Sequence, residues 1–275
     1  MIFQKSLTLL IALLIPVGFN GGLIADSFET NSEVLIAKEK KQLGLDEVDR
    51  LIDQVEKEEE DSNYQRAIEI LETILVIQQR ELGSDHQDVA YTFNWLGDLY
   101  FFQELFLDAE KSYWSAFKIQ EKNLDPNDKD FLTTIDNLVN LLVDQNKYIA
   151  AENLAQKLLN GYESFLEAMN IELAEKINTL AYIYLKNNEY EKAKPLYIRE
   201  IKILKYNLGE EHQRLSNPLN NLGYMYAEEG LFKKAESVLN NAIKIRENTY
   251  GTDHKKLLSP LNNLSYLYEK KGDIL

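Results

Sequence analysis

The stretch Leu215–Tyr250, LSNPLNNLGYMYAEEGLFKKAESVLNNAIKIRENTY, decides the fold of this chain. In its first half, Leu219, Leu222 and Tyr226 recur at the spacing of a helix with one apolar face. Its second half carries another such face, and Glu229-Gly230 lies between the two. The stretch therefore predicts two helices joined by a short turn.

The same pattern returns every 42 residues along the chain. One position of the second helix is always alanine: Ala67, Ala109, Ala151, Ala193 and Ala235. One position of the first helix is always leucine: Leu96, Leu138, Leu180, Leu222 and Leu264. The residue after each leucine is small or nearly so: Gly97, Val139, Ala181, Gly223 and Ser265. Small residues beside large ones let two helices approach closely. A fixed period of this length predicts an all-α array of stacked helix pairs.

The repeated unit resembles a tetratricopeptide repeat. That pattern runs from an aromatic residue through Leu-Gly and Tyr to Ala and a second aromatic. Its offsets are met by Phe93, Leu96, Gly97, Tyr100, Ala109 and Tyr113. The long period and the loop Leu208–His212, LGEEH, are similar to the kinesin light chain type of this repeat. The resemblance implies a right-handed superhelical solenoid of stacked antiparallel helix pairs, with a concave groove in which partner peptides lie.

Four parts of the chain can be distinguished. We predict a signal peptide or membrane anchor over 1–25, a linker over 26–46, a degenerate N-terminal repeat over 47–88, and an array of four full repeats and a terminal half repeat over 89–275. The degenerate repeat is expected to begin with one short helix around Val48–Val55. Within the array, Gly161 lies inside a second helix, where it costs about 1 kcal/mol relative to alanine. We therefore expect a weak point there.

Residues 1–25 determine the predicted location. Lys5 precedes an apolar run, Leu7–Val17, which has the length of a signal-peptide core, and Ala25 offers a cleavage site. The alternative is an uncleaved anchor over Ile2–Ile24, long enough to cross a bilayer. The first alternative predicts a periplasmic or secreted protein. The second predicts a membrane-anchored protein with the repeats outside the cytoplasm of a bacterium.

Composition and motifs exclude several classes of function. A net charge of −15 argues against a nucleic-acid binder, which needs clustered Lys and Arg. The lack of cysteine removes thiolate metal sites and a cysteine nucleophile. His86, His212 and His254 fall in separate loops, too far apart to share a metal, and we expect them to cap the helices that follow. No catalytic or phosphate-binding motif is present. We predict no enzyme activity, no cofactor and no metal site.

The first helices carry the candidate binding site. One column of residues, 42 apart, consists of Asn94, Asp136, Asn178, Asn220 and Asn262. Four residues later, and so on the same side of each helix, the next column consists of Asp98, Asn140, Tyr182, Tyr224 and Tyr266. The resemblance places these columns on the concave groove. We predict that a peptide is contacted by Asn94, Asp98, Asn178, Tyr182, Asn220, Tyr224, Asn262 and Tyr266.

Two explanations of the asparagine column remain open. Asparagine is a poor helix former, so its repetition inside helices costs stability. In one explanation the side-chain amides bridge neighbouring helices. In the other they donate to and accept from the backbone of an extended peptide, while the tyrosines stack on its side chains. One amide can do both.

The sequence predicts a non-enzymatic scaffold that binds a partner peptide or protein on the concave face. An alternative is that the chain is the truncated N-terminal regulatory arm of a larger protein such as a caspase-like peptidase. The last repeat reads as unfinished, because Leu257–Lys271 has no second helix after it. A third alternative is self-association through that exposed terminal helix.

Overall fold

The computed structural model describes the backbone of residues 21–272 and the side chains from residue 37 onward, except that of Lys40. The elements of the described part follow one another as α2 (Gly21–Glu60), α3 (Tyr64–Leu82), α4 (Gln87–Phe102), α5 (Phe106–Asn123), α6 (Lys129–Asp144), α7 (Tyr148–Glu163), α8 (Ile171–Lys186), α9 (Tyr190–Leu208), η1 (Gln213–Leu215), α10 (Ser216–Glu228), α11 (Phe232–Tyr250), η2 (Lys255–Leu257) and α12 (Leu258–Lys271). There is no strand within residues 21–272.

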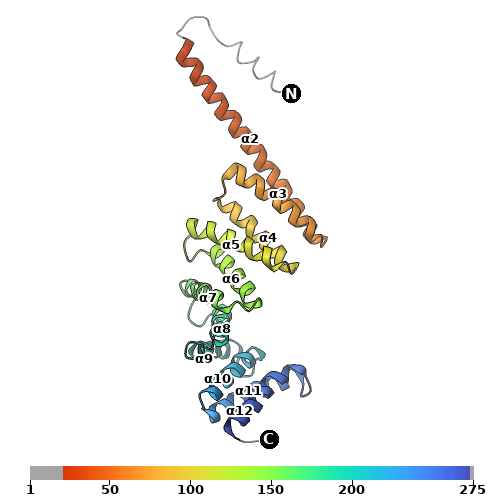
Figure 1. The fold of residues 1–275 in the computed structure, drawn as a ribbon, viewed down its shortest axis with the longest axis vertical. Helices are drawn as coiled ribbons and strands as arrows, with labels where there is room; N and C mark the ends of the chain where they lie inside the picture. Colours follow the sequence, from red (N-terminus) through yellow and green to blue (C-terminus); the bar gives the residue numbers. More distant parts are fainter. Residues whose placement is uncertain (1–20, 273–275) are drawn as a thin grey trace.

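The helices stack as pairs into an elongated array (Figure 1). Helices α4, α6, α8, α10 and α12 are the first helices of successive repeats, and α3, α5, α7, α9 and α11 are the second helices. Each helix packs mainly against the helices before and after it in the chain. In a repeat array each unit contacts only its neighbours, and no single large core is needed. The packing observed here has this form, so the predicted all-α solenoid of helix pairs is confirmed.

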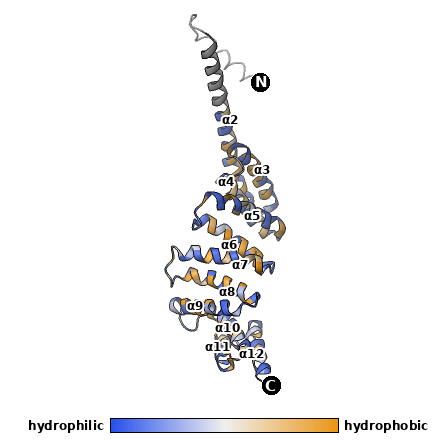
Figure 2. Ribbon diagram, turned by 60° about the vertical axis from the view of Figure 1, so that its left-hand side comes forward, coloured by the Kyte–Doolittle hydropathy of each residue, from blue (hydrophilic) through white to orange (hydrophobic). Residues whose placement is uncertain are grey.

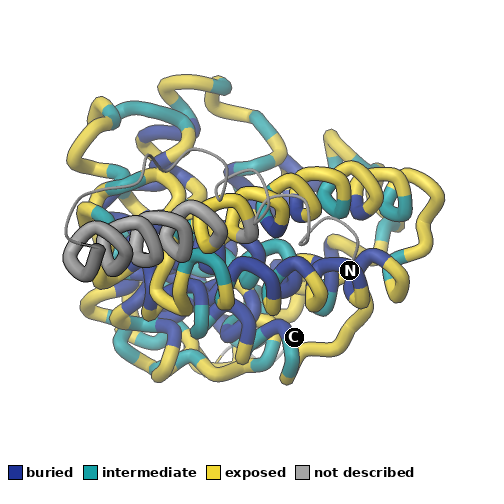
Figure 3. Tube along the Cα trace, turned by 90° about the horizontal axis from the view of Figure 1, so that it is seen from above, coloured by how far each residue is buried: buried dark blue, intermediate teal, exposed yellow. Residues whose placement is uncertain are grey.

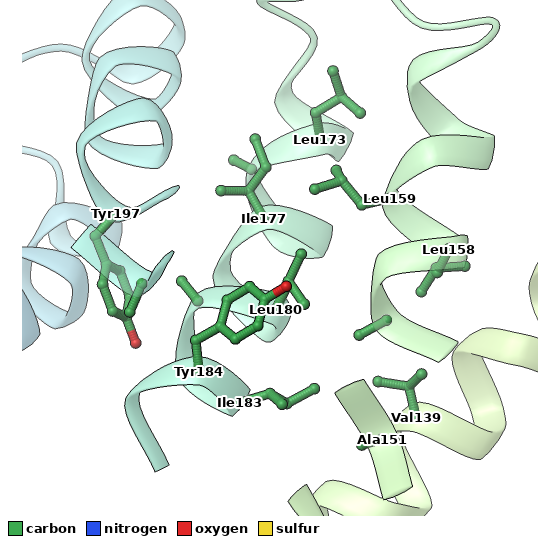
Figure 4. Close-up of a cluster of buried hydrophobic side chains, with 14 of the residues drawn as sticks. Val139, Ala151, Leu158, Leu159, Leu173, Ile177, Leu180, Ile183, Tyr184 and Tyr197 are labelled. Atoms are coloured by element: carbon green, nitrogen blue, oxygen red, sulfur yellow. The ribbon is translucent and has the colours of Figure 1, made fainter. Parts of the chain in front are cut away.

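The repeated apolar columns form the interior. All five column alanines are fully buried, and the column leucines of α4, α6, α8 and α10 are at most 5% exposed. Hydrophobic and hydrophilic residues alternate along the helices of the array (Figure 2), and the buried positions lie inside the array when it is viewed along its length (Figure 3). Figure 4 shows the centre of this core, where Leu159 of α7 lies beside Leu173 and Ile177 of α8.

The turn inside each repeat has the same geometry throughout. One or two residues after the end of the first helix, a residue adopts a positive φ at six positions 42 residues apart: Ser62, Glu104, Asn146, Asn188, Gly230 and Gly272. At the first five of these turns the next backbone N–H donates back to the fifth residue before it, as from Asn63 to Glu58 and from Leu231 to Tyr226. This left-handed residue closes the first helix and reverses the chain.

The N-terminal end differs from the prediction. Helix α2 spans 40 residues, Gly21–Glu60, so the expected short helix and the expected linker over 26–46 both lie within one continuous helix. Its C-terminal part packs on α3 through Val48 and Val55, which are buried, and its N-terminal part extends beyond the array (Figure 1). The predicted signal or anchor falls largely on residues 1–20, outside the described part. No helix of the described residues is long and apolar enough to cross a membrane.

Glycines stand where two helices touch. A Cβ atom added to Gly97 of α4 would lie 2.5 Å from the ring of Tyr113 in α5, and one added to Gly223 would lie 2.5 Å from Cγ of Leu239. Gly161, expected to be a weak point, is another such contact, because its added Cβ would lie 2.4 Å from Cδ2 of the buried Leu132. Helix α7 runs through Gly161 and ends two residues later. Glycine is therefore favoured there by packing, against its poor helix propensity.

We predict that Gly97→Ala destabilises the protein, although alanine is the better helix former. The added methyl group meets the Tyr113 ring, which is 3% exposed and held by a hydrogen bond to Asp98, so overpacking costs about 1–3 kcal/mol. The matched control is Ser265→Ala at the equivalent, exposed position of α12, with a change of less than about 0.5 kcal/mol. Urea unfolding of both variants measures this. A stabilised Gly97→Ala protein would contradict the close packing.

Candidate functional site

The loops between repeats orient the first helices through side-chain caps. In His86, His212 and His254, Nδ1 accepts a hydrogen bond from the backbone N–H two residues later, each at 3.2 Å. At the two intervening equivalent positions, Oδ1 of Asp128 and Oδ1 of Asn170 accept in the same way. The predicted capping role of the histidines is confirmed. An accepting Nδ1 places the proton of a neutral imidazole on Nε2. Among the described residues, no group of three His, Asp or Glu side chains could hold a metal ion.

The predicted asparagines do not share one environment. Nδ2 of Asn94 donates to Oγ1 of Thr134 in the next first helix. Nδ2 of Asn220 donates to Oγ of Ser259, and its Oδ1 accepts from Asn263, both on α12. These two asparagines therefore bridge neighbouring repeats, as in the first of the two explanations. Asn262, at the same position of α12, is exposed, and its side chain has no hydrogen bond to any described residue.

Asn178 contacts a buried acid. Its Nδ2 lies 3.0 Å from both carboxyl oxygens of Glu200 on α9, a residue only 4% exposed. The other residues at the Glu200 position of the repeat are apolar: Ile74, Ala116, Leu158 and Ala242. Burial raises the pKa of Glu200 to about 8, and the hydrogen bond from Asn178 and the charge of Arg214 offset only part of that rise. The sequence analysis did not identify Glu200, although a single charged residue in an otherwise apolar column of the repeat indicates an unusual buried site.

The predicted tyrosines form a succession of ring contacts along the array. The rings of Tyr148 and Tyr182 are 5.9 Å apart, edge to face, and those of Tyr190 and Tyr224 repeat this geometry 42 residues later at 6.1 Å. Tyr224 also contacts Tyr266 of the next repeat at 5.7 Å. All three predicted tyrosines are half-buried, so each ring is fixed by its neighbours and keeps part of its surface accessible.

Charged side chains frame these rings. Lys186 lies 5.2 Å above the Tyr182 ring, and Lys270 lies 5.3 Å above the Tyr266 ring. The hydroxyl of Tyr266 donates to Glu228, which also pairs with Lys270 at 2.9 Å. The structure therefore joins Tyr182, Tyr224 and Tyr266 to aromatic partners, and it fixes the orientation of the last one by a hydrogen bond and a cation above the ring.

The N-terminal end of the same face is different. Asp98, the first member of the tyrosine column, is exposed, and its Oδ1 accepts from the hydroxyl of Tyr113 at 2.6 Å and from Nδ2 of Asn137 at 2.9 Å. A pocket of about 460 Å³ lies nearby between α2, α3 and α4, lined in part by Tyr91 and Trp95. Indole Nε1 of Trp95 donates to Glu59 at 3.1 Å. Sequence analysis did not find this pocket, because it depends on where the long helix α2 packs.

Comparison with known proteins identifies the family. The "Tetratricopeptide repeat" family models match residues 131–166, 172–248 and 214–274. The chain is a tetratricopeptide repeat protein. Tetratricopeptide arrays are in general scaffolds for protein–protein interaction, and their members are typically not enzymes. No curated protein sequence was found to match the chain.

Solved structures share the fold of this tetratricopeptide protein. The "kinesin light chain nearly identical TPR-like repeats" of Podosopora anserina match with a TM-score of 0.60 at 19% identity, over 74% of this chain and 96% of that one. BtubC (BKLC) from P. vanneervenii matches at 0.56 and 20% identity, over 81% and 85%. YrrB, "a TPR protein with an unusual peptide-binding site", matches at 0.54 and 16% identity, over 76% and 91%. The repeats are thus of the kinesin light chain-like type in fold.

We predict that Glu200→Gln stabilises the protein at neutral pH. The unfolded chain loses the Glu200 proton near the ordinary pKa of 4.5, whereas the folded chain holds it to about pH 8. Stability is therefore lost as the pH rises between these values, by about 3 kcal/mol at pH 7. Glutamine is neutral and keeps an oxygen for Asn178. Urea unfolding from pH 5 to pH 8 should show the two proteins diverging as the pH rises. Parallel pH profiles would contradict the buried acid.

Proposed function

We propose that this protein binds an extended segment of a partner protein along the face of its first helices, the concave face of the array. The observation that carries the proposal is the succession of half-buried rings, Tyr182, Tyr224 and Tyr266, each held by another aromatic side chain. Rigid aromatic side chains supply contact area at low entropic cost, which is why they are frequent anchors at interfaces.

The asparagines divide between two roles in this proposal. Asn94, Asn178 and Asn220 use their Nδ2 atoms within the array, so their main contribution is to hold the first helices in place. Asn262 has no such partner among the described residues and keeps both donor and acceptor for a ligand backbone. Recognition is then carried by the tyrosines together with Asn262, and less by the asparagine column as a whole.

We expect the double variant Tyr182→Ala/Tyr224→Ala, and separately Asn262→Ala, to lose a partner captured by the wild-type protein from extracytoplasmic extract. Loss of the two anchors should weaken binding at least about tenfold. The control is Tyr206→Ala, which removes a 75% exposed tyrosine from the second helix α9. Circular dichroism and melting of all variants show whether the fold is intact. Undiminished capture by the folded double variant would contradict the proposal.

Self-association through α12 is a second candidate role. Leu258 and Leu261 of α12 are 61% and 44% exposed, whereas their counterparts in α10, Ser216 and Leu219, are buried. The equivalent residues of α8, Ala174 and Ile177, are also buried. The side of a first helix that elsewhere contacts other helices is thus accessible on α12, and apolar surface of this kind favours association.

Light scattering tests this role. We expect a dimer mass for the wild-type protein and a monomer mass for Leu258→Ser/Leu261→Asn, because the double change removes the exposed apolar surface without touching the rest of the core. Leu107→Ser on α5, where the leucine is 70% exposed, is the control and should remain dimeric. A wild-type monomer, or an unchanged mass in the double variant, rules the interface out.

Two further predictions from the sequence remain proposals. Export by a cleaved signal, or anchoring through residues 1–25, is tested by sequencing the N-terminus of the mature protein. The role of a regulatory arm of a larger protein, such as a caspase-like peptidase, is tested by whether the reading frame continues beyond Leu275.

A further inference from the structure

A basic pocket lies at the C-terminal end of the array. It has a volume of about 360 Å³, within the range of small-ligand sites, and it lies between the start of α10, the end of α11 and η2. Its charged lining residues are Arg214, Arg246 and Lys256, and no described carboxylate lines it. A lining with three cations and no acid stands out in a chain whose net charge is −15.

Arg246 is the central residue of this pocket. It is only 8% exposed, and its guanidinium donates to three neutral oxygens: Oγ of Ser216, Oδ1 of Asn217 at 2.7 Å and the backbone carbonyl of Lys256. No Asp or Glu of the described residues forms an ion pair with it. A guanidinium has five N–H groups, so one further N–H remains on each of its two terminal nitrogens.

The equivalent positions in other repeats show that a charge is not needed for packing there. Gln120 and Gln78 occupy the Arg246 position three and four repeats earlier in the chain. Each accepts a hydrogen bond from a threonine of the next first helix, Gln78 from Thr92 at 2.6 Å and Gln120 from Thr134 at 2.5 Å. A neutral side chain therefore occupies the same position of the repeat twice in this chain. Burying a charge costs free energy unless it is paired, so Arg246 carries a cost that the glutamines avoid.

The other two cations lie at the edges of the pocket. Lys256 lies 4.2 Å from the centre of the Tyr250 ring, and its Nζ is 3.1 Å from the tyrosine hydroxyl. Arg214 pairs with Glu175 at 3.0 Å, and the two side chains are 36% and 65% exposed. An exposed pair of this kind contributes little free energy, so Arg214 is able to turn to an anion at small cost.

We propose that this pocket is an oxyanion site, in which Arg246 binds a carboxylate or phosphate group while Lys256 and Arg214 add positive charge. An arriving oxyanion would supply the missing counter-charge to a desolvated guanidinium, and such charge-assisted hydrogen bonds are the strong ones. The site goes beyond the proposed peptide-binding face and adjoins it, because Asn217 of the pocket lies one helical turn before Asn220 and Asn221 on α10.

Isothermal titration at constant ionic strength tests the site with three probes and no partner protein. These are inorganic phosphate, the capped peptide acetyl-Ala-Asp-Ala-amide, and the same peptide with Asn in place of Asp. We expect the wild-type protein to bind phosphate, the Asp peptide or both, and to ignore the Asn peptide. Binding of phosphate alone identifies a free anion as the ligand. Binding of the Asp peptide identifies a carboxylate carried by a polypeptide.

The variants make the assignment specific. Arg246→Gln introduces the residue that this chain already uses at positions 78 and 120, so it should fold, and it should weaken anion binding at least tenfold. Lys244→Gln removes an exposed cation of the same helix that pairs with Glu211, and it should bind as the wild type does. No binding by the wild-type protein, or equal binding by Arg246→Gln, overturns the proposal. Because the probes bypass the tyrosine face, either result is independent of partner capture.

Discussion

The packing of the helix pairs α4–α5 and α10–α11 depends on the same close contact, between a glycine of the first helix and a large side chain of the second helix. At Gly97 and Gly223 the separation leaves no room for a side-chain carbon. This contact fixes how near the two helices lie, and the column of buried alanines on the second helix allows the same approach from the other side. With the pair fixed, the left-handed residue of the turn and the cap of the next helix set where the following pair begins.

The polar residues inside the array show how such a core tolerates variation. Where Gln78 meets Thr92 and Gln120 meets Thr134, the buried amide oxygen accepts a hydrogen bond from the threonine hydroxyl and no charge is buried, although Nε2 of Gln120 has no partner among the described residues. Glu200 and Arg246 occupy core columns with ionisable groups instead, and burial shifts the pKa of each toward its neutral form, upward for the acid and downward for the guanidinium. Each of these two residues places an ionisable group in the core, and burying its charged form lowers the free energy of unfolding.

Sequence reasoning predicted what depends on the repeat and missed what breaks it. The period, the buried columns and the capping histidines follow from residues that recur at one spacing, so a single chain supplies several copies of the evidence. The length of α2 could not be predicted, because residues 26–46 are polar and only weakly patterned. The partners of the asparagines also differ from repeat to repeat. Asn178 turns to Glu200 in its own repeat, whereas Asn94 and Asn220 reach the next one, and such choices depend on tertiary contacts that the column does not show.

Because each helix packs mainly on its neighbours in the chain, nearly all of the stabilising contacts join residues that are close in sequence. The entropy lost in closing loops is then small at every step, and folding can begin in any repeat and spread to those beside it. Among the described helices, α12 contacts only the helices that precede it, and Leu258 and Leu261 on it are exposed. A helix held by fewer buried contacts opens at a lower free energy than one packed on both sides, such as α8.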